Sequence, residues 1–278
     1  MPVGRLVLAV LLGAVAASAT VAAPRVQSVA VGKNIDWIFG RQPNPARYQV
    51  GNVSLIIQAH DMGKRGQVPF ARPRVTVQMP GYPPVVMEGL DSSPAASVNR
   101  ISVGRWEGGQ SYVLLQSHDG GAYCCLRVQV AIPQGRRLRV IALGRFDSEY
   151  LSPLPSDIDS DGRVDFVLPD GRFLYRFGSS ADSVQPPMIL NIVNGAKQDV
   201  SNRPGFRPIF QKALRESRRG CLRRDRPNGA CAAYVASAAR VGQLDQAWAE
   251  MLTAYDQKTW RYPHELRQFL IKYDFVRQ

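Results

Sequence analysis

A nine-residue acidic segment constrains this chain more than any other stretch of its sequence. Its aspartates stand at the first, third, fifth and ninth positions and a glycine at the sixth: Asp157, Asp159, Asp161, Asp165 and Gly162. Four carboxylates this close together repel one another unless a cation lies between them. Alternate side chains of a curled loop converge on one point, and their oxygens suit a hard cation. The sequence therefore predicts a calcium-binding loop.

The calcium ligands that we predict all lie within this loop. Four aspartate side chains would bind, and the seventh position would contribute a backbone carbonyl oxygen: Asp157, Asp159, Asp161, Arg163 and Asp165. An EF-hand loop would carry a glutamate at the twelfth position, where this chain has Leu168. The pattern therefore argues against an EF-hand and its helix pair. An acidic surface turn without an ion is the alternative interpretation.

Residues 157–177 resemble the calcium loops of FG-GAP and VCBS-type repeat proteins, which have a D-x-D-x-D-G-x-x-D pattern. That resemblance implies that the loop joins β-strands and that calcium has a structural role. The loops of those families occur in tandem and in propellers. This sequence contains one copy, which argues against a full propeller.

Short β-prone segments separated by glycine- and proline-rich turns run from residue 48 to about residue 200. Examples are 53–57, 74–79, 126–132 and 138–143, and several alternate between apolar and polar residues. Alternation with a period of two is typical of strands. We therefore expect an antiparallel β-domain, either a sandwich or a strongly curved sheet, with a propeller-like arrangement as a further alternative.

The segment that follows the acidic loop has the pattern of a hairpin. Apolar residues 166–168 and 172–177 flank the turn sequence Pro169-Asp170-Gly171. An Asp-Gly turn between two apolar runs favours two paired strands. The acidic loop is therefore expected to lead directly into a β-hairpin.

The character of the sequence changes near residue 201. Residues 209–218 have helical character, the alanine-rich residues 230–239 precede Gly242, and Pro263 begins a last helix. We therefore predict an α+β protein in which a small C-terminal helical unit follows the β-domain. The expected divisions are a signal peptide (1–22), an N-terminal extension (23–47), a β-rich calcium-binding domain (48–200) and an α-helical domain (201–278).

The N-terminus has the features of a secretory signal peptide. Arg5 precedes an apolar run at 6–17, and small residues follow at 18–23. The run is short and rich in alanine for a membrane span, so an uncleaved anchor is the weaker alternative. No other stretch is a candidate span. We therefore expect a periplasmic or secreted protein with no transmembrane span after cleavage.

Four cysteines allow three complete disulfide pairings, and the sequence does not choose among them. Bridging Cys221 to Cys231 across the intervening turn is the simplest. Residues 117–125 look like a Gly-Gly-Ala-His-Cys-Cys signature of some exported β-proteins, with Tyr123 in place of the histidine. A vicinal disulfide between Cys124 and Cys125, other thiol pairing, or a soft-metal site that includes His118 remain open there.

The chain is strongly basic, with a formal net charge of +13. Arginines are concentrated in residues 203–226, where they could bind an anionic envelope polymer or the acidic face of a protein partner. A solvated helix face is the alternative interpretation. Aromatic residues do not interleave with the basic ones, so the sequence carries no specific signal for nucleic-acid binding.

No catalytic residue can be assigned from the sequence. The chain has no G-x-S-x-G, H-E-x-x-H or P-loop sequence, and only three histidines. We therefore expect an exported, non-catalytic calcium-binding β-protein that acts as a cell-envelope binding or interaction module, with calcium as a structural ion. The alternative is a hydrolase acting on cell-envelope or glycan material, with the same structural calcium.

Overall fold

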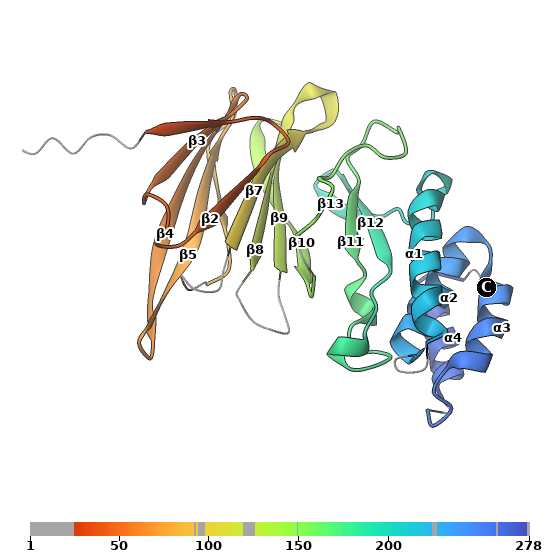
Figure 1. Ribbon diagram of the computed structural model, residues 1–278. Coiled ribbons are helices and arrows are strands. Elements are labelled where there is room, and N and C mark those ends of the chain that lie inside the picture. The colour runs from red at the N-terminus through yellow and green to blue at the C-terminus, as the bar shows by residue number, and fades with distance from the viewer. Residues whose placement is uncertain are drawn as a thin grey trace, which may run out of the picture.

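A computed structural model describes residues 25–91, 93, 98–118, 126–148, 150–223, 227–259 and 261–276. Two β-sheets, a smaller third sheet and a group of helices follow one another along the molecule (Figure 1). This arrangement confirms the α+β class, with a β-rich N-terminal part and a helical C-terminal unit. The predicted signal peptide lies outside the described residues.

The first sheet has five strands in the order β1-β3-β4-β5-β6. Its neighbours are antiparallel except for β1 and β3, which are parallel. The strands are β1 (Val26–Val29), β3 (Ala46–Val50), β4 (Val53–Arg65), β5 (Val68–Gln78) and β6 (Val85–Glu88).

The second sheet is antiparallel, with the order β10-β9-β8-β7-β2. The strands are β2 (Asn34–Ile38), β7 (Val98–Arg105), β8 (Ser111–His118), β9 (Leu126–Gln134) and β10 (Arg137–Phe146). Alternate residues of both sheets, such as Leu55, Val75 and Ile101, are buried in one cluster between them. The two sheets therefore form a sandwich, because every second side chain of a strand points to the same face.

The sandwich begins earlier in the chain than the sequence suggested. Residues 23–47, expected as an extension, contain β1, β2 and the start of β3. β2 pairs with β7 and places Trp37 opposite Asn99, with the Trp37 ring buried in the core. Ile35 and Trp37 alternate with exposed polar residues, so this short strand buries one face like the others.

The second sheet is the middle layer of the β-rich part. Residues 112–117 of β8 are all buried. Leu115 packs into the sandwich core, whereas Leu114 packs on the opposite face with Phe166 and Leu190 of the third sheet. A strand covered on both faces needs apolar residues at consecutive positions, which explains the unbroken apolar run in this part of the sequence.

The third sheet is antiparallel and has the order β11-β12-β13. Its strands are β11 (Phe166–Pro169), β12 (Pro187–Val193) and β13 (Ala196–Asp199). The predicted hairpin between 166–168 and 172–177 is wrong, because β11 pairs with β12 instead.

The residues after β11 turn away from the sheet for two reasons. The buried Asp170 carboxylate accepts hydrogen bonds from the backbone N–H and the Nε of Arg172, at 3.1 and 2.7 Å, and so caps a single helical turn. Phe173 and Phe177 are then buried among the helices. Burial of two aromatic rings outweighs the turn preference of the Asp-Gly pair.

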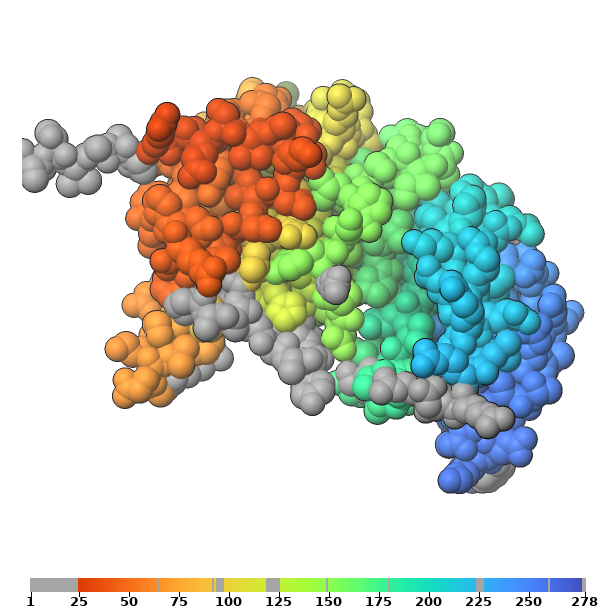
Figure 2. All heavy atoms as spheres, viewed as in Figure 1, coloured from red at the N-terminus to blue at the C-terminus, as the bar shows by residue number. Residues whose placement is uncertain are grey.

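Four α-helices follow in the described part of the chain: α1 (Arg207–Cys221), α2 (Pro227–Val241), α3 (Leu244–Ala254) and α4 (Tyr262–Lys272). A disulfide joins Cys221, at the end of α1, to Cys231 in α2. In the space-filling view the helical unit lies at the opposite end of the molecule from the first strands, with residues of the third sheet between them (Figure 2). Among the described helices, none is long and apolar enough to cross a membrane.

Candidate calcium loop and its surroundings

The acidic loop closes on itself between the sandwich and the third sheet. Its two ends form an isolated β-bridge, in which the Asp165 N–H donates to the Ser156 carbonyl oxygen at 2.9 Å. Gly162 has a φ of +83°, which glycine adopts without steric cost. The glycine at the sixth position therefore makes the sharp turn that the sequence predicts.

Backbone N–H groups inside the loop bind three of the aspartates, Asp157, Asp161 and Asp165. The Asp157 carboxylate accepts from the N–H groups of Asp161 and Gly162, at 3.1 and 3.0 Å. The Asp161 Oδ1 accepts from the N–H of Arg163 at 2.9 Å. These hydrogen bonds within the protein are enough to hold the loop in a tight curl.

Asp165 is the most buried of the four aspartates, with no exposed surface. Its oxygens accept from the Ile158 N–H at 2.7 Å and from the Asn191 Nδ2 at 2.6 Å. Asn191, in β12, also donates to the Val164 carbonyl oxygen at 3.1 Å. Burial raises the pKa of Asp165 above its ordinary value, and the two hydrogen bonds oppose that rise.

Three of the five predicted ligands come together. One side-chain oxygen each from Asp157, Asp159 and Asp165 lies within 4.8 Å of the other two. The Asp159 Oδ1 is buried and has no hydrogen-bond partner among the residues that the structure describes. Asp161 is outside this group, and the ligand role of the Arg163 carbonyl oxygen stays a prediction.

Arg203, which precedes the helical unit, supplies a positive charge to the loop. Its Nη1 is 3.5 Å from the Asp159 Oδ2 and also forms an ion pair and hydrogen bond with the Asp161 Oδ2. Gly205 packs against the same aspartate, since a Cβ at Gly205 would overlap the Asp159 Cβ. The acidic loop is therefore a contact between the β-rich part and the start of the helices.

A cavity of about 590 Å³ lies beside the loop, and Asp157 and Arg163 form part of its wall. Trp106, Glu107 and Tyr112 of the sandwich line the other side. Burial raises the pKa of Glu107, the Arg163 charge opposes that rise, and the Asp161 charge adds to it. The Glu107 Oε1 is buried without a hydrogen-bond partner in the described part of the chain.

The structure describes two of the four cysteines. The structure forms the Cys221–Cys231 disulfide, one of the pairings left open. Cys124, Cys125 and Tyr123 lie outside the described residues, so the alternatives for that segment stay open.

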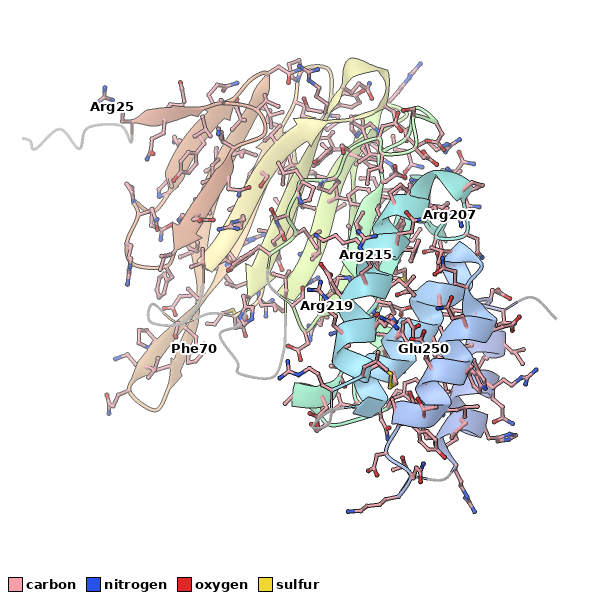
Figure 3. All side chains as sticks on the ribbon, turned by 45° about the vertical axis from the view of Figure 1, so that its right-hand side comes forward. Arg25, Phe70, Arg207, Arg215, Arg219 and Glu250 are labelled. Atoms are coloured by element: carbon pink, nitrogen blue, oxygen red, sulfur yellow. A yellow bond between two sulfur atoms is a disulfide. The ribbon has the colours of Figure 1, made fainter. Side chains whose placement is uncertain are left out.

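The arginine side chains of segment 203–226 have different surroundings in the structure. Arg203 pairs with the acidic loop, and the Arg218 Nε donates to the Glu250 Oε2 at 2.7 Å. Exposed arginines lie along α1, where Figure 3 labels Arg207, Arg215 and Arg219. Residues 224–226 lie outside the described residues.

Sequence signals for the partners of the loop are weak. Asn191, Arg203, Gly205 and Glu107 are all distant from the acidic segment in the chain, and none belongs to a recognisable motif. The concentration of arginines in residues 203–226 was the single sequence signal for a residue that contacts the loop. It did not distinguish Arg203 from the neighbouring arginines.

These features define a β-sandwich protein with a helical C-terminal unit and a curled acidic loop where the two parts meet. The chain is 31% identical over 238 residues to the probable thylakoid lumen protein sll0997 of Synechocystis sp., a match that covers 73% of this chain and 68% of that protein. The chain therefore belongs to the family of sll0997. Residues 209–274, which include all of α2, α3 and α4, match the family model of the sll0997 C-terminal domain.

A second relative is the uncharacterized protein y4bJ of Sinorhizobium fredii. It is 28% identical over 150 residues, which cover 53% of this chain and 24% of y4bJ. No solved structure matches the chain significantly.

Proposed function

We propose that this chain is an exported, non-catalytic calcium-binding β-protein that acts as a cell-envelope binding or interaction module, with calcium as a structural ion. The observation that carries the proposal is the convergence of Asp157, Asp159 and Asp165, whose oxygens lie within 4.8 Å of one another. The Asp159 Oδ1 supports it, because this buried oxygen has no hydrogen-bond partner among the described residues, which is costly unless a cation binds it.

The residues present fit a calcium ion. Calcium takes six to eight oxygen ligands and tolerates irregular geometry, so three carboxylates, a carbonyl oxygen and water molecules would suffice. Bound calcium would neutralise the loop and thereby take over the role that Arg203 has in this structure. Because the ion would bind the folded loop and not the unfolded chain, it would stabilise the fold by mass action.

Export is supported by two findings. The related sll0997 is named a probable thylakoid lumen protein, and the lumen lies outside the cytoplasm. The Cys221–Cys231 disulfide suits an oxidising compartment, since disulfides seldom persist in the cytosol. A periplasmic or lumenal location agrees with the signal peptide that the sequence predicts.

The calcium proposal can be tested by thermal unfolding of the mature protein. We expect calcium to raise the melting temperature and EDTA to lower it, and Asp159→Asn to remove most of the response. Asp245→Asn is the matched control, because Asp245 is exposed in the first turn of α3. Equal melting temperatures of the wild type in calcium and in EDTA would contradict the proposal.

Hydrolysis of envelope or glycan material is the second candidate function, and one observation favours it. Burial raises the pKa of Glu107, and its buried Oε1 has no hydrogen-bond partner in the described residues. Glu107 lines the 590 Å³ cavity together with Asp157. A carboxyl group with a raised pKa that shares a cavity with a second carboxylate is the arrangement of a general acid. Release of reducing ends from purified envelope polysaccharide, abolished in a folded Glu107→Gln variant, would establish this function; no release by the wild type would exclude it for that substrate.

A further inference from the structure

The arginines of α1 differ in whether an acidic side chain forms an ion pair with them. Arg218 is paired with Glu250, whereas Arg207, Arg215 and Arg219 have no ion pair to an acid in the described part of the chain. Arg219 donates to the Arg215 carbonyl oxygen at 3.3 Å, which leaves its charge uncompensated. The helix contains one acidic residue, Glu216, which lines a groove between α1 and residues 151–155.

These three arginines form an unevenly spaced row on α1, which we call the arginine stripe. They stand at intervals of eight and four residues on α1, with the polar Gln211 between the first two. Each four-residue step advances a helix by about 6 Å and turns it about 40° past a full turn. Arg207 and Arg219 therefore lie about 120° apart around α1. The three exposed arginines, which Figure 3 labels, follow a row that slants across the solvent side of the helix.

We propose that the arginine stripe binds a linear acidic polysaccharide, whose charges would lie one after another along α1. The proposal rests on the binding role assigned to this chain above and is independent of calcium. Guanidinium groups bind carboxylate and sulfate-like oxygens through two parallel hydrogen bonds, and a row of them matches an extended chain of anions better than a single compact one.

Other anionic partners fit the stripe less well. A membrane-bound helix inserts an apolar face, but the apolar residues of α1, such as Phe210 and Leu214, are buried in the helical core. A protein partner would need apolar or aromatic anchors, and the large apolar residues between the arginines, Ile209, Phe210 and Leu214, pack on the helical core. A single-stranded nucleic acid would need aromatic platforms for its bases, which this stripe lacks.

The test is the binding of the full mature protein to dextran sulfate, a linear polyanion, with neutral dextran as the matched probe. We expect the protein to bind dextran sulfate but not neutral dextran. The affinity for dextran sulfate should fall as the salt concentration rises. The triple variant R207Q/R215Q/R219Q should bind at least tenfold more weakly. Its slope of log affinity against log salt should be smaller by about two to three, because each lost contact no longer releases a counter-ion.

A control variant separates the stripe from the overall charge. R41Q/R136Q/R137Q removes the same charge from exposed sites on the sandwich and should bind like the wild type. Equal losses in the two triple variants would overturn the proposal, since binding would then follow net charge alone. Stripe-dependent binding to vesicles containing anionic phospholipid, without binding to dextran sulfate, would overturn it in favour of a membrane.

Two further readouts keep the proposal separate from the calcium proposal. Each titration is run in calcium and in EDTA, and the loss caused by the stripe variant should be the same in both. A melting temperature of the triple variant close to that of the wild type shows that weaker binding is not unfolding. Polyanion binding that fails while the calcium response of the melting temperature persists would contradict only the stripe proposal.

Discussion

The Arg203 guanidinium forms an ion pair with the Asp161 carboxylate across the junction between the acidic loop and the helical unit. The same guanidinium nitrogen lies 3.5 Å from Asp159. One side chain from the far side of the junction thus supplies positive charge to a loop that carries four aspartates. In this structure, the acidic loop connects the two parts of the molecule electrostatically.

Removal of this charge should weaken the fold and strengthen calcium binding. Arg203→Gln leaves Asp159 and Asp161 to repel one another, and the partly exposed pair contributes about 1 kcal/mol at most. We expect a lower melting temperature in EDTA and a smaller difference from the wild type in calcium. Isothermal titration should give tighter calcium binding, because no arginine has to be displaced.

Arg207→Gln is the control for that variant, because Arg207 is exposed and lies just beyond the junction. It should change neither the melting temperature in EDTA nor the calcium affinity. Weaker calcium binding by Arg203→Gln would show that the arginine and the ion do not compete for the same carboxylates.

Asn191 should be important for stability although it is far from the loop in the sequence. Asn191→Leu removes the donor to the buried Asp165 carboxylate and to the Val164 carbonyl oxygen. Leaving a buried acceptor without its donor costs about 1 to 3 kcal/mol. Urea unfolding measures this loss; Gln198→Leu, opposite Asn191 on the exposed strand β13, should have little effect.

Gly205 should not tolerate even a methyl group. A Cβ there would overlap the Asp159 Cβ, so Gly205→Ala must push the start of the helical unit away from the loop. Overpacking of this kind typically costs about 1 to 3 kcal/mol. Gly171→Ala is the matched control, since a Cβ at Gly171 meets nothing within 4 Å. Equal unfolding midpoints for the two variants would show that the contact is not tight.

The helical unit should lose stability in acid through Glu250. The Arg218 hydrogen bond is the main reason that the pKa of Glu250 is lowered from 4.5 to about 2, with help from the Tyr234 hydroxyl at 2.9 Å. A lowered pKa means that the folded state holds fewer protons than the unfolded state in this range. The stabilisation is therefore complete above pH 4.5 and is lost as the pH falls toward about 2.

Glu250→Gln should remove that part of the acid dependence. Its free energy of unfolding should change less than that of the wild type between pH 4.5 and about 2. Glu265→Gln, at an exposed site on α4, should keep the acid dependence of the wild type. Urea titrations at several pH values measure both, and parallel curves for Glu250→Gln and the wild type would contradict the assigned ion pair.

Sequence patterns predicted where the helices and strands lie better than they predicted which strands pair with one another. Alternation in residues such as 74–79 predicted strands, and helical spacing predicted the helices near 209–218 and 230–239, because these signals depend only on nearby residues. The hairpin after the acidic loop failed, since the fate of residues 172–177 depended on Phe173 and Phe177 finding a core among the helices. A turn preference is too weak to compete with that burial.

The sequence by itself determined the class of the fold and the curled acidic loop. The loop aspartates, Gly162 and the backbone N–H groups that bind them lie within nine residues, so their geometry is local. Only the tertiary structure decided that Asn191, Arg203 and Gly205 surround this loop, and that three arginines of α1 have no ion pair in the part of the chain that the structure describes: Arg207, Arg215 and Arg219. Which charged groups lie next to a side chain depends on packing between segments that are distant in the sequence. A local sequence pattern therefore cannot predict them.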